Sequence, residues 1–435
     1  MLLHGPSKGG NMKLRCRIIL IVTLVFLLVQ STVVWSDVLP VVKPEAVGLS
    51  SQRLERLGAV LRADVEQGKI PGAVVLVARR GKIAYYESFG MRDKEAKAPM
   101  KKDAIFRIYS MTKPIVTVGV MLLNQEGKLF LADPVSKYVP ELGKLKVCAE
   151  TTNTQTGEAT CADTPSLRDM TIQDLLRHTS GLTYGFFGKS AVKGLYVKTG
   201  VETQDQTLPE MITKMGKLPL AYQPGTTWDY SRSTDVLGRV IEVASGMPLD
   251  RFVEERVLRP LKMEDSGFYV RPEKHNRIAQ GQKDPKTGKP PTLNDVTKPP
   301  KLLSGGGGMV ATTMDYARFL QMLLDGGQLD GVQLLNRKII EYMTADHLGT
   351  TVKPGPIYLP GIGYGFGLGF AVRLQNGVSA WPGTAGDYYW DGMAGTTFWV
   401  DPKEELFAVF MIQEPSQRLN YRYLMRSIVY QSILN

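Results

Sequence analysis

A nearly all-apolar run, residues 115–123, constrains the fold of this 435-residue chain more than any other feature. A helix that is apolar on every side is stable only where other elements surround it, so the run predicts a central, buried helix. Pro114 stands just before the run, and a proline without an N–H is accepted in the first turn of a helix. The helix is therefore expected to begin near Ser110, with the rest of the chain enclosing it.

Ser110-Met111-Thr112-Lys113 opens this helix with a possible nucleophile and a possible base. A serine hydroxyl attacks only when a base takes its proton, and a lysine three residues later lies on the same helix face. Burial disfavours the ammonium form, and the neutral amine that results can accept a proton. We interpret Ser110 as a candidate nucleophile and Lys113 as its base. An ordinary core helix that carries a chance motif is the alternative.

The same pattern occurs a second time, at Ser190-Ala191-Val192-Lys193. Glycine and lysine residues surround this copy, and no apolar helix follows it. These surroundings favour a solvent-exposed loop, so no catalytic role is expected for the second copy.

Residues 1–36 have the pattern of a secretory signal peptide. Met12-Lys13-Leu14-Arg15-Cys16-Arg17 is a basic segment, residues 18–29 form an apolar core, and Val34-Trp35-Ser36 offers small residues near a cleavage point. The apolar core is too short to span a bilayer. The sequence predicts an exported chain, periplasmic or secreted, that keeps no stable membrane span after cleavage. An uncleaved N-terminal anchor is the alternative.

Charge and ligand spacing narrow the possible functions. The formal net charge is +11, and removal of residues 1–36 takes away four basic residues and no acidic ones, which leaves a mild +7. The sequence has no basic stripe interleaved with aromatic residues, so nucleic acid is a poor candidate partner. It has neither His-x-x-x-His nor paired-cysteine spacing, so no metal and no other cofactor are expected.

The sequence also argues against two other kinds of site, a serine–histidine catalytic triad and a phosphate-binding loop. The sequence contains no Gly-x-Ser-x-Gly, and a serine–histidine triad would have to draw on scattered histidines, of which His178 is expected to be structural. The glycine run 305–308 lacks the Gly-Lys-Ser/Thr ending of a phosphate-binding loop and is expected to form a tight packing turn.

Two cysteines, Cys148 and Cys161, remain after the predicted signal peptide. The stretch between them is rich in threonine, asparagine and glycine and has almost nothing to bury. In an oxidising compartment a disulfide that closes this loop is the expected arrangement. Two unrelated thiols are the alternative.

The order of elements predicts an α+β fold. Strands are expected near both ends of the chain and helices between them, which indicates an antiparallel sheet flanked by helices, with an inserted all-helical domain. The sheet part is expected at about 45–135 and 305–435, and the helical part at about 136–304. The expected helices are 54–65, 314–324 and 419–433, with mostly helical structure over 170–261; the expected strands are 73–79, 83–89, 367–373, 396–400 and 406–412; residues 281–303 are expected to be a surface loop.

Acyl transfer also needs a second proton carrier and donors for an oxyanion. Tyr230 lies on a loop just before a helical pattern, and it suits the role of the second proton carrier if a nearby lysine lowers its pKa. A buried structural tyrosine is the alternative. Trp390-Asp391-Gly392-Met393 is a glycine-containing approach to a strand, where a backbone N–H could hold an oxyanion.

Five motifs in order give the chain a resemblance to a known family. The sequence resembles the serine β-lactamase-like superfamily over about residues 45–430, nearest to class C β-lactamases and family VIII carboxylesterases. The motifs are Ser110-Met111-Thr112-Lys113, Arg177-His178-Thr179-Ser180-Gly181-Leu182, Tyr230-Ser231, Gly305-Gly306-Gly307-Gly308-Met309-Val310 and Phe398-Trp399-Val400-Asp401-Pro402.

The resemblance implies a β-lactamase/transpeptidase-like fold and a set of roles. Ser110 would form the acyl-enzyme, Lys113 would be its base, and Tyr230 would carry the proton to and from the leaving group. The backbone N–H groups of Ser110 and Met393 would form the oxyanion hole.

Two departures from the class C pattern favour ester substrates. Arg232 stands where those enzymes carry the asparagine of Tyr-x-Asn, and Trp390-Asp391-Gly392 stands where they carry Lys-Thr-Gly. In class C enzymes the asparagine amide and the lysine bind the β-lactam, and this chain has neither at those positions. A tryptophan there instead makes an apolar wall like that of the esterases. Tyr184, Phe186, Phe187, Tyr388, Tyr389 and Trp390 are candidates to line an apolar pocket, with plain core packing as the alternative.

We therefore expect an exported serine hydrolase that cleaves small carboxylic esters through an acyl-enzyme on Ser110. The alternatives of the same fold are a β-lactamase, a D-amino-acid peptidase or amidase, and an acyltransferase. A non-catalytic cell-envelope relative is the alternative from a different class.

Overall fold

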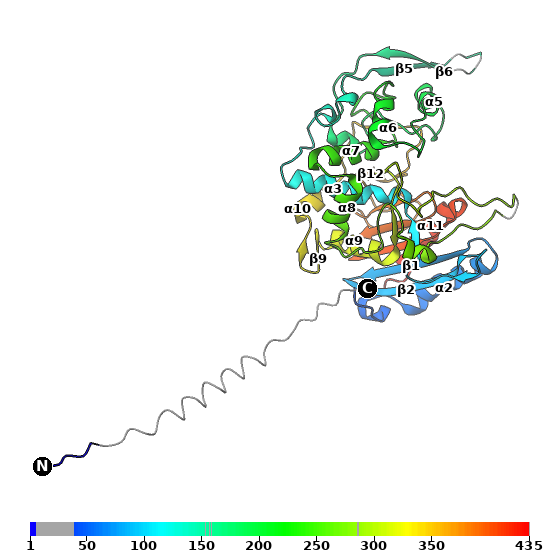
Figure 1. The fold of residues 1–435 in the computed structure, drawn as a ribbon. Coiled ribbons are helices and arrows are strands. Elements are labelled where there is room, and N and C mark those ends of the chain that lie inside the picture. The colour runs from blue at the N-terminus through cyan, green and yellow to red at the C-terminus, as the bar shows by residue number, and fades with distance from the viewer. Residues whose placement is uncertain (6–38, 153, 156, 158, 285–286, 435) are drawn as a thin grey trace. The chain divides into compact units, whose positions relative to one another are not determined.

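The computed structural model describes residues 1–5, 39–152, 154–155, 157, 159–284 and 287–434 (Figure 1). The chain divides into two compact units, residues 1–38 and 39–435, of which the first is described only at its exposed residues 1–5. Nearly all of the predicted signal peptide thus lies outside the described residues. Among the residues that are described, no helix is long and apolar enough to cross a membrane.

An eight-stranded antiparallel sheet forms the base of the second unit, in the order β12-β13-β14-β15-β16-β1-β2-β3. The C-terminal strand β16 lies between β15 and the N-terminal strand β1, with Val74 opposite Met411. The two ends of the chain therefore build one sheet. Its strands are β1 (Gly72–Arg79), β2 (Lys82–Asp93), β3 (Ala98–Pro99), β12 (Tyr364–Phe366), β13 (Ala371–Arg373), β14 (Tyr388–Asp391), β15 (Thr397–Asp401) and β16 (Leu406–Met411).

Helices cover both faces of this sheet. Successive side chains of a strand point to opposite faces, and Phe398 and Trp399 are neighbours in β15. The Phe398 ring packs on Tyr316 of α9 (Thr313–Leu324), while the Trp399 ring packs on Tyr430 of α11 (Arg418–Gln431). Helix α2 (Ser51–Glu66) packs beside α11. The predicted α+β class, an antiparallel sheet flanked by helices, is confirmed.

The predicted central helix is α3 (Thr112–Gln125), with every residue from 112 to 123 buried. A 3₁₀ turn, η2 (Tyr109–Met111), leads into it, so Pro114 lies in the first turn as expected. Helix α3 packs against α7 (Ser233–Ser245) and α8 (Leu249–Val253) of the helical part. It thus joins the sheet part of the molecule to the helical part.

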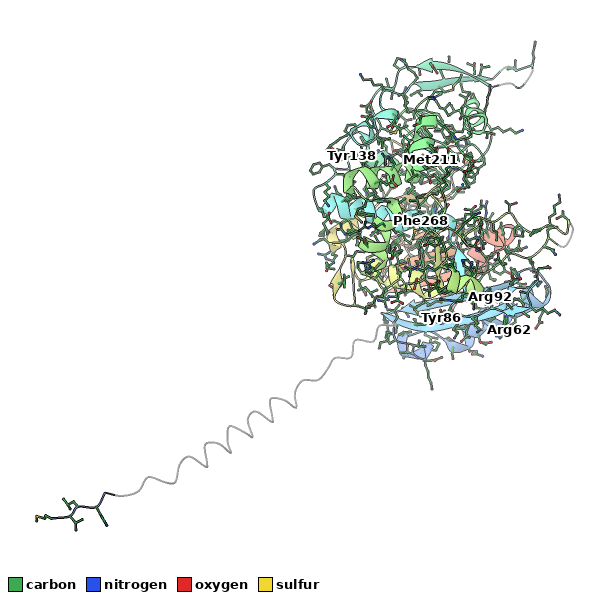
Figure 2. The ribbon with its side chains drawn as sticks, in the orientation of Figure 1. Arg62, Tyr86, Arg92, Tyr138, Met211 and Phe268 are labelled. Atoms are coloured by element: carbon green, nitrogen blue, oxygen red, sulfur yellow. A yellow bond between two sulfur atoms is a disulfide. The ribbon has the colours of Figure 1, made fainter. Side chains whose placement is uncertain are left out.

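One hydrophobic core runs through both parts. Met211 and Phe268 are both buried in it, whereas Arg62 lies at the surface and pairs with Glu55 (Figure 2). The remaining helices are η1 (Pro44–Val47), η3 (Val135–Lys137), η4 (Pro140–Leu142), α4 (Ile172–Leu176), α5 (Ala191–Lys198), α6 (Leu208–Met215), the π-helical η5 (Glu254–Leu258), η6 (Pro272–Arg277), α10 (Arg337–Met343) and η7 (Pro415–Gln417). The short strands are β4 (Ile105–Arg107), β7 (Thr227–Trp228), β8 (Val310–Thr312), β9 (Gln328–Leu329), β10 (Val332–Gln333) and β11 (Lys353–Pro354).

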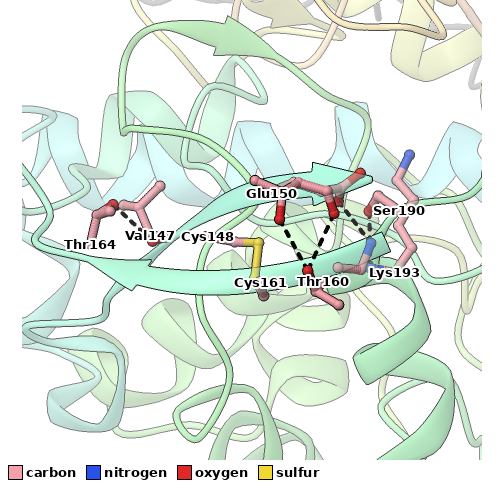
Figure 3. Close-up of a disulfide and its surroundings, with 10 residues drawn as sticks. Val147, Cys148, Glu150, Thr160, Cys161, Thr164, Ser190 and Lys193 are labelled. Atoms are coloured by element: carbon pink, nitrogen blue, oxygen red, sulfur yellow. Dashed lines mark hydrogen bonds between the residues drawn. A yellow bond between two sulfur atoms is a disulfide. The ribbon is translucent and has the colours of Figure 1, made fainter. Parts of the chain in front are cut away.

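The inserted part is not purely helical, because it carries a β-hairpin. Strands β5 (Val147–Thr152) and β6 (Ala159–Thr164) pair where a plain loop was expected. Cys148 lies opposite Asp163 and Cys161 lies opposite Glu150, so the two cysteines are diagonal neighbours with Cα atoms 5.2 Å apart. A disulfide joins them (Figure 3).

Candidate active site

The chain makes a tight turn immediately before Ser110. Strand β4 pairs with β8, and the Ile108 N–H donates to the Met309 carbonyl at 3.1 Å. Tyr109 then adopts φ 42°, a left-handed conformation that a bulky residue rarely takes. Its hydroxyl accepts the Asn294 N–H at 3.1 Å, which holds the turn in place. This turn sets Ser110 at the entrance to α3.

The Lys113 side chain reaches back to Ser110, one helical turn away. Its Nζ lies 3.2 Å from Ser110 Oγ, 3.2 Å from the Tyr184 hydroxyl and 2.6 Å from the Gly306 carbonyl oxygen. Lys113 is only 1% exposed, so these groups replace water around the amine.

Burial lowers the pKa of Lys113 to about 7, and the nearby Arg232 adds to this effect while Asp235 opposes it. A neutral amine has two N–H donors and one lone pair. With the two donors on Gly306 and Tyr184, the lone pair is left for the Ser110 hydroxyl proton. The arrangement therefore suits Lys113 to the role of base.

The predicted packing turn at 305–308 also takes part in the site. The Gly306 N–H donates to Asp235 Oδ1 at 3.0 Å, and its carbonyl accepts from Lys113. A Cβ at this position would lie 2.7 Å from Asp235 Oδ2 and 2.9 Å from the Tyr184 hydroxyl. Only glycine fits there, and motif spacing gave no sign of this backbone contact.

Tyr230 completes the polar group around the serine. Its side chain forms a hydrogen bond with Ser110, and the Trp390 indole N–H donates to its hydroxyl at 3.2 Å. Burial raises the pKa of Tyr230 rather than lowering it, although the Lys113 Nζ lies 4.5 Å from the ring centre. The expected lowering by lysine is therefore wrong in direction. A phenol that keeps its proton at neutral pH can donate it to a leaving group.

The segment that follows β14 approaches the serine closely because of Gly392. A Cβ on Gly392 would lie 2.1 Å from Thr396 Oγ1 and 2.5 Å from the Ile108 carbonyl oxygen, so only glycine allows this contact. The Gly392 N–H is already bonded to the Thr396 carbonyl at 2.7 Å. The next N–H, that of Met393, has no acceptor within the described part of the chain and is open to a substrate oxygen.

Two cavities meet at Ser110. The larger, about 480 Å³, is mostly aromatic and aliphatic, and the smaller, about 160 Å³, has both aromatic and polar side chains in its walls. Both are lined by Ser110, Phe187, Tyr230 and Met393, the last of which is 42% exposed. The larger cavity is also lined by Trp390, Trp381, Tyr358 and Ile362, and the smaller cavity is also lined by Tyr184, Phe186, Glu202, Gln204, Arg232 and Asn294.

The six aromatic candidates from the sequence divide into two groups. Tyr184, Phe186, Phe187 and Trp390 line one or both cavities. The other two, Tyr388 and Tyr389, are buried and line neither cavity. Tyr184 has a closer role than the sequence indicated, because its hydroxyl contacts Lys113.

Arg232 is buried beside the site with its charge compensated. It pairs with Asp235 at 3.3 Å and with Glu202, and its guanidinium lies 5.0 Å from the centre of the Tyr184 ring. It therefore braces the tyrosine that contacts the lysine.

The second Ser-x-x-Lys is not the solvent-exposed loop that was expected. Ser190 caps α5, since its Oγ accepts the Lys193 N–H at 3.2 Å (Figure 3). Lys193 is only 5% exposed; its Nζ donates to the Phe187 carbonyl and lies 3.9 Å from Asp229 Oδ1. The apolar faces of α5 pack inward, which the glycine and lysine neighbours concealed. This pair supports the wall of the site.

His178 is buried and lines neither of the two cavities at Ser110. Its Nδ1 lies 3.1 Å from Ser231 Oγ, its ring packs against Tyr230, and burial holds its pKa well below the usual range. Among the described residues, no group of histidine, cysteine or acidic side chains could hold a metal ion.

Comparison with known proteins agrees with this geometry. The family model described as Beta-lactamase matches residues 57–426. Protein Rv1367c of Mycobacterium tuberculosis is 34% identical over 368 residues, covering 82% of this chain and 88% of that protein. Esterase EstB of Burkholderia gladioli is 32% identical over 384 residues, covering 82% of this chain and 90% of that protein.

A solved structure shows the same fold. It is that of EstCE1, described as a hydrolase with promiscuous acyltransferase activity, with a TM-score of 0.72 and 25% identity. The match covers 88% of this chain and 98% of that one. With the family model spanning most of the chain, the protein belongs to the β-lactamase-like family of serine hydrolases.

Proposed function

We propose that this protein is an exported carboxylesterase that cleaves small, rather apolar esters through an acyl-enzyme on Ser110. The observation that carries the proposal is the buried Lys113 amine, with a pKa lowered to about 7, that lies 3.2 Å from Ser110 Oγ beside an apolar cavity. The esterase EstB among its relatives supports the ester as the substrate class.

Acylation begins when Ser110 Oγ attacks the ester carbonyl carbon and its proton passes to the Lys113 amine. The carbonyl oxygen becomes negative and is held by the N–H groups of Met393 and Ser110. Tyr230 gives its proton to the alcohol oxygen as the carbon–oxygen bond breaks, and is reprotonated from Lys113. Hydrogen bonds that join Ser110 to both side chains support this relay.

Deacylation repeats the same steps with water as the nucleophile. Tyr230 and Lys113 together take a proton from water as the water oxygen attacks the acyl carbon. They return this proton to Ser110 Oγ as its bond to the acyl carbon breaks and the acid leaves. An alcohol that takes the place of water would give acyl transfer, the side activity named for EstCE1.

Two residues favour esters over β-lactams. Arg232 stands where class C enzymes carry an asparagine whose amide binds a lactam side chain. Its guanidinium is instead paired with Asp235 and Glu202. Trp390 turns its indole N–H to Tyr230, and no lysine stands there to bind a lactam carboxylate.

Hydrolysis of p-nitrophenyl butyrate and of nitrocefin by the purified protein tests the proposal. We expect the ester to have the larger kcat/KM, and Ser110→Ala to abolish both its hydrolysis and labelling by a fluorophosphonate. Ser190→Ala, in the second copy of the motif, is the matched control and should retain activity. Faster turnover of nitrocefin, or labelling that survives Ser110→Ala, would contradict the proposal.

Export remains a prediction from residues 1–36. Fractionation of expressing cells and N-terminal sequencing of the recovered protein test it, with a mature chain that begins near residue 37 as the expected result.

A further inference from the structure

A buried carboxylate lies behind the glycine turn at 305–308. Asp235 belongs to the first turn of α7 and is fully buried. Its Oδ1 accepts the Ser304 hydroxyl at 2.5 Å and the Gly306 N–H at 3.0 Å. The Ser304 carbonyl in turn accepts the N–H groups of Gly307 and Gly308. One carboxylate oxygen therefore fixes the start of the turn.

The turn connects this carboxylate to the lysine. Gly306 donates its N–H to Asp235, and its carbonyl oxygen accepts from Lys113 Nζ at 2.6 Å. That contact is shorter than the two that the same amine makes with Ser110 and Tyr184, each 3.2 Å. A single residue thus separates the carboxylate from the amine, and the place of the amine depends on where that residue is held.

The carboxylate also supplies charge where the reaction needs it. When Lys113 takes the Ser110 proton it becomes an ammonium, and a buried ammonium costs free energy unless negative charge lies near it. Among the described residues, no carboxylate is within ion-pair distance of the amine. Burial lowers the pKa of Lys113, Asp235 raises it, and Arg232 lowers it further.

The other titratable groups around the amine are neutral or paired. The rings of Tyr230 and Tyr184 lie 4.5 and 5.5 Å from it, and burial raises the pKa of both phenols above the usual range. His178 packs against Tyr230, and burial lowers its pKa, so it is neutral as well. Glu202 pairs with Arg232. The charges that act on the amine are thus those of Arg232 and the buried acid.

We propose that Asp235 is a positioning residue for the reaction: through Gly306 it holds the Lys113 amine against Ser110, and its charge stabilises the ammonium that forms there. The carboxylate lines neither of the two cavities at Ser110, so it acts through the turn and not on the substrate. It takes up no proton, because the proton moves from Ser110 Oγ to the amine. The inference deepens the proposed function and rests on it.

Asp235→Asn tests the role of the charge. The amide keeps an oxygen that can accept from Ser304 and Gly306, and it loses the negative charge. A negative charge favours the ammonium, so its removal lets the amine become neutral at lower pH. We expect the midpoint of the pH profile of kcat/KM for p-nitrophenyl butyrate to fall by about one pH unit. The level reached above the midpoint should fall about tenfold, because the amine is then a weaker base.

Arg232→Gln tests the same charges in the opposite direction. It removes the positive charge that disfavours the ammonium, so the midpoint should rise by about one pH unit. A change of opposite sign in this variant separates an electrostatic effect from a general loss of structure, which would not reverse its direction. Either variant alone is sufficient to decide the proposal if the other does not fold.

Asp315→Asn is the matched control. Asp315 is also a buried carboxylate in the first turn of a helix, α9, and it accepts the Ser266 hydroxyl at 2.9 Å and the Asp265 N–H at 2.8 Å. It lines neither of the two cavities at Ser110. The midpoint of this variant should therefore stay at the wild-type value.

Asp235→Ala tests the positioning role. It removes the acceptor as well as the charge, so Gly306 is no longer held. We expect kcat to fall about tenfold below that of Asp235→Asn, while KM stays within about threefold because the cavity walls are unchanged.

The possible results separate the two proposals. A midpoint in Asp235→Asn equal to that of the wild-type protein, or moved equally in Asp315→Asn, would overturn the role of Asp235 and leave the esterase in place. Failure of the wild-type protein to hydrolyse p-nitrophenyl butyrate, or labelling that survives Ser110→Ala, would overturn the proposed function and the role of Asp235 with it.

Discussion

A single buried amine gives the site its dependence on pH. Burial lowers the pKa of Lys113 to about 7, so the amine is charged below that pH and neutral above it. Only the neutral form can take the Ser110 proton. We therefore expect kcat/KM for p-nitrophenyl butyrate to rise about tenfold per pH unit below pH 7 and to level off above it. A stopped-flow or plate assay from pH 5 to 9 measures this profile.

Lys113→Met should lower kcat/KM by at least about a hundredfold and remove the step near pH 7. Lys198→Met, which changes an exposed lysine of α5, is the control and should keep the wild-type profile. A step near pH 7 that persists in Lys113→Met would assign the titration to another group.

Local spacing was enough to predict part of the site. Ser110 and Lys113 lie one helical turn apart, so their contact follows from the sequence. The contacts of Tyr184 and Gly306 with Lys113 do not, because they join segments 71 and 193 residues away from the lysine. The direction of the Tyr230 pKa shift also depends on burial, which motif spacing does not report.

At the scale of the element, α5 holds a wall of the site through one buried ion pair. Lys193→Met would leave Asp229 buried without its cation, and burial already raises the pKa of that carboxyl. We expect the free energy of unfolding, measured with urea, to fall by about 3 kcal/mol. Lys189→Met, at an exposed position, should change it by less than about 0.5 kcal/mol.

Asp229→Asn added to Lys193→Met should restore part of the lost stability, since no charge would then remain buried. Equal losses in the single and double variants would show that the Phe187 carbonyl, rather than Asp229, is the contact that matters.

The β5–β6 hairpin is closed by a disulfide between residues 13 positions apart. Loop closure of this size stabilises the native state by about 3 kcal/mol. Replacement of Cys148 and Cys161 by serine should lower the melting temperature, measured by calorimetry, while kcat/KM stays within about twofold because neither residue lines the two cavities at Ser110. A large loss of kcat/KM at a temperature where the variant is folded would contradict this.

Elements with a strong apolar pattern could be predicted and polar ones could not. Residues 115–123 are apolar all round, and the structure has them in the buried helix α3. Strand β16 is an unbroken apolar run, β1 is apolar up to its last residue, Arg79, and both strands are buried throughout. The hairpin β5–β6 is rich in polar residues and half exposed. Its sequence therefore lacks the alternation of apolar and polar residues from which a strand is predicted.

At the scale of the whole molecule, the sheet depends on both ends of the chain. Strand β16 joins β15 to β1, and α11 covers one face. A chain that stops after Asp401 lacks both elements. We expect it to show no cooperative thermal transition and no fluorophosphonate labelling, although Ser110 and Lys113 are present. Labelling of this shortened chain at the wild-type rate would show that the active site forms without β16 and α11, and would contradict this expectation.

The position of β16 also bears on when activity can arise during synthesis. A ribosome makes the nucleophile and its lysine long before it makes β16, the strand that joins the two parts of the sheet. Synthesis must therefore pass β16 before a working enzyme can form, and a message cut short before that point yields the motif without the catalyst.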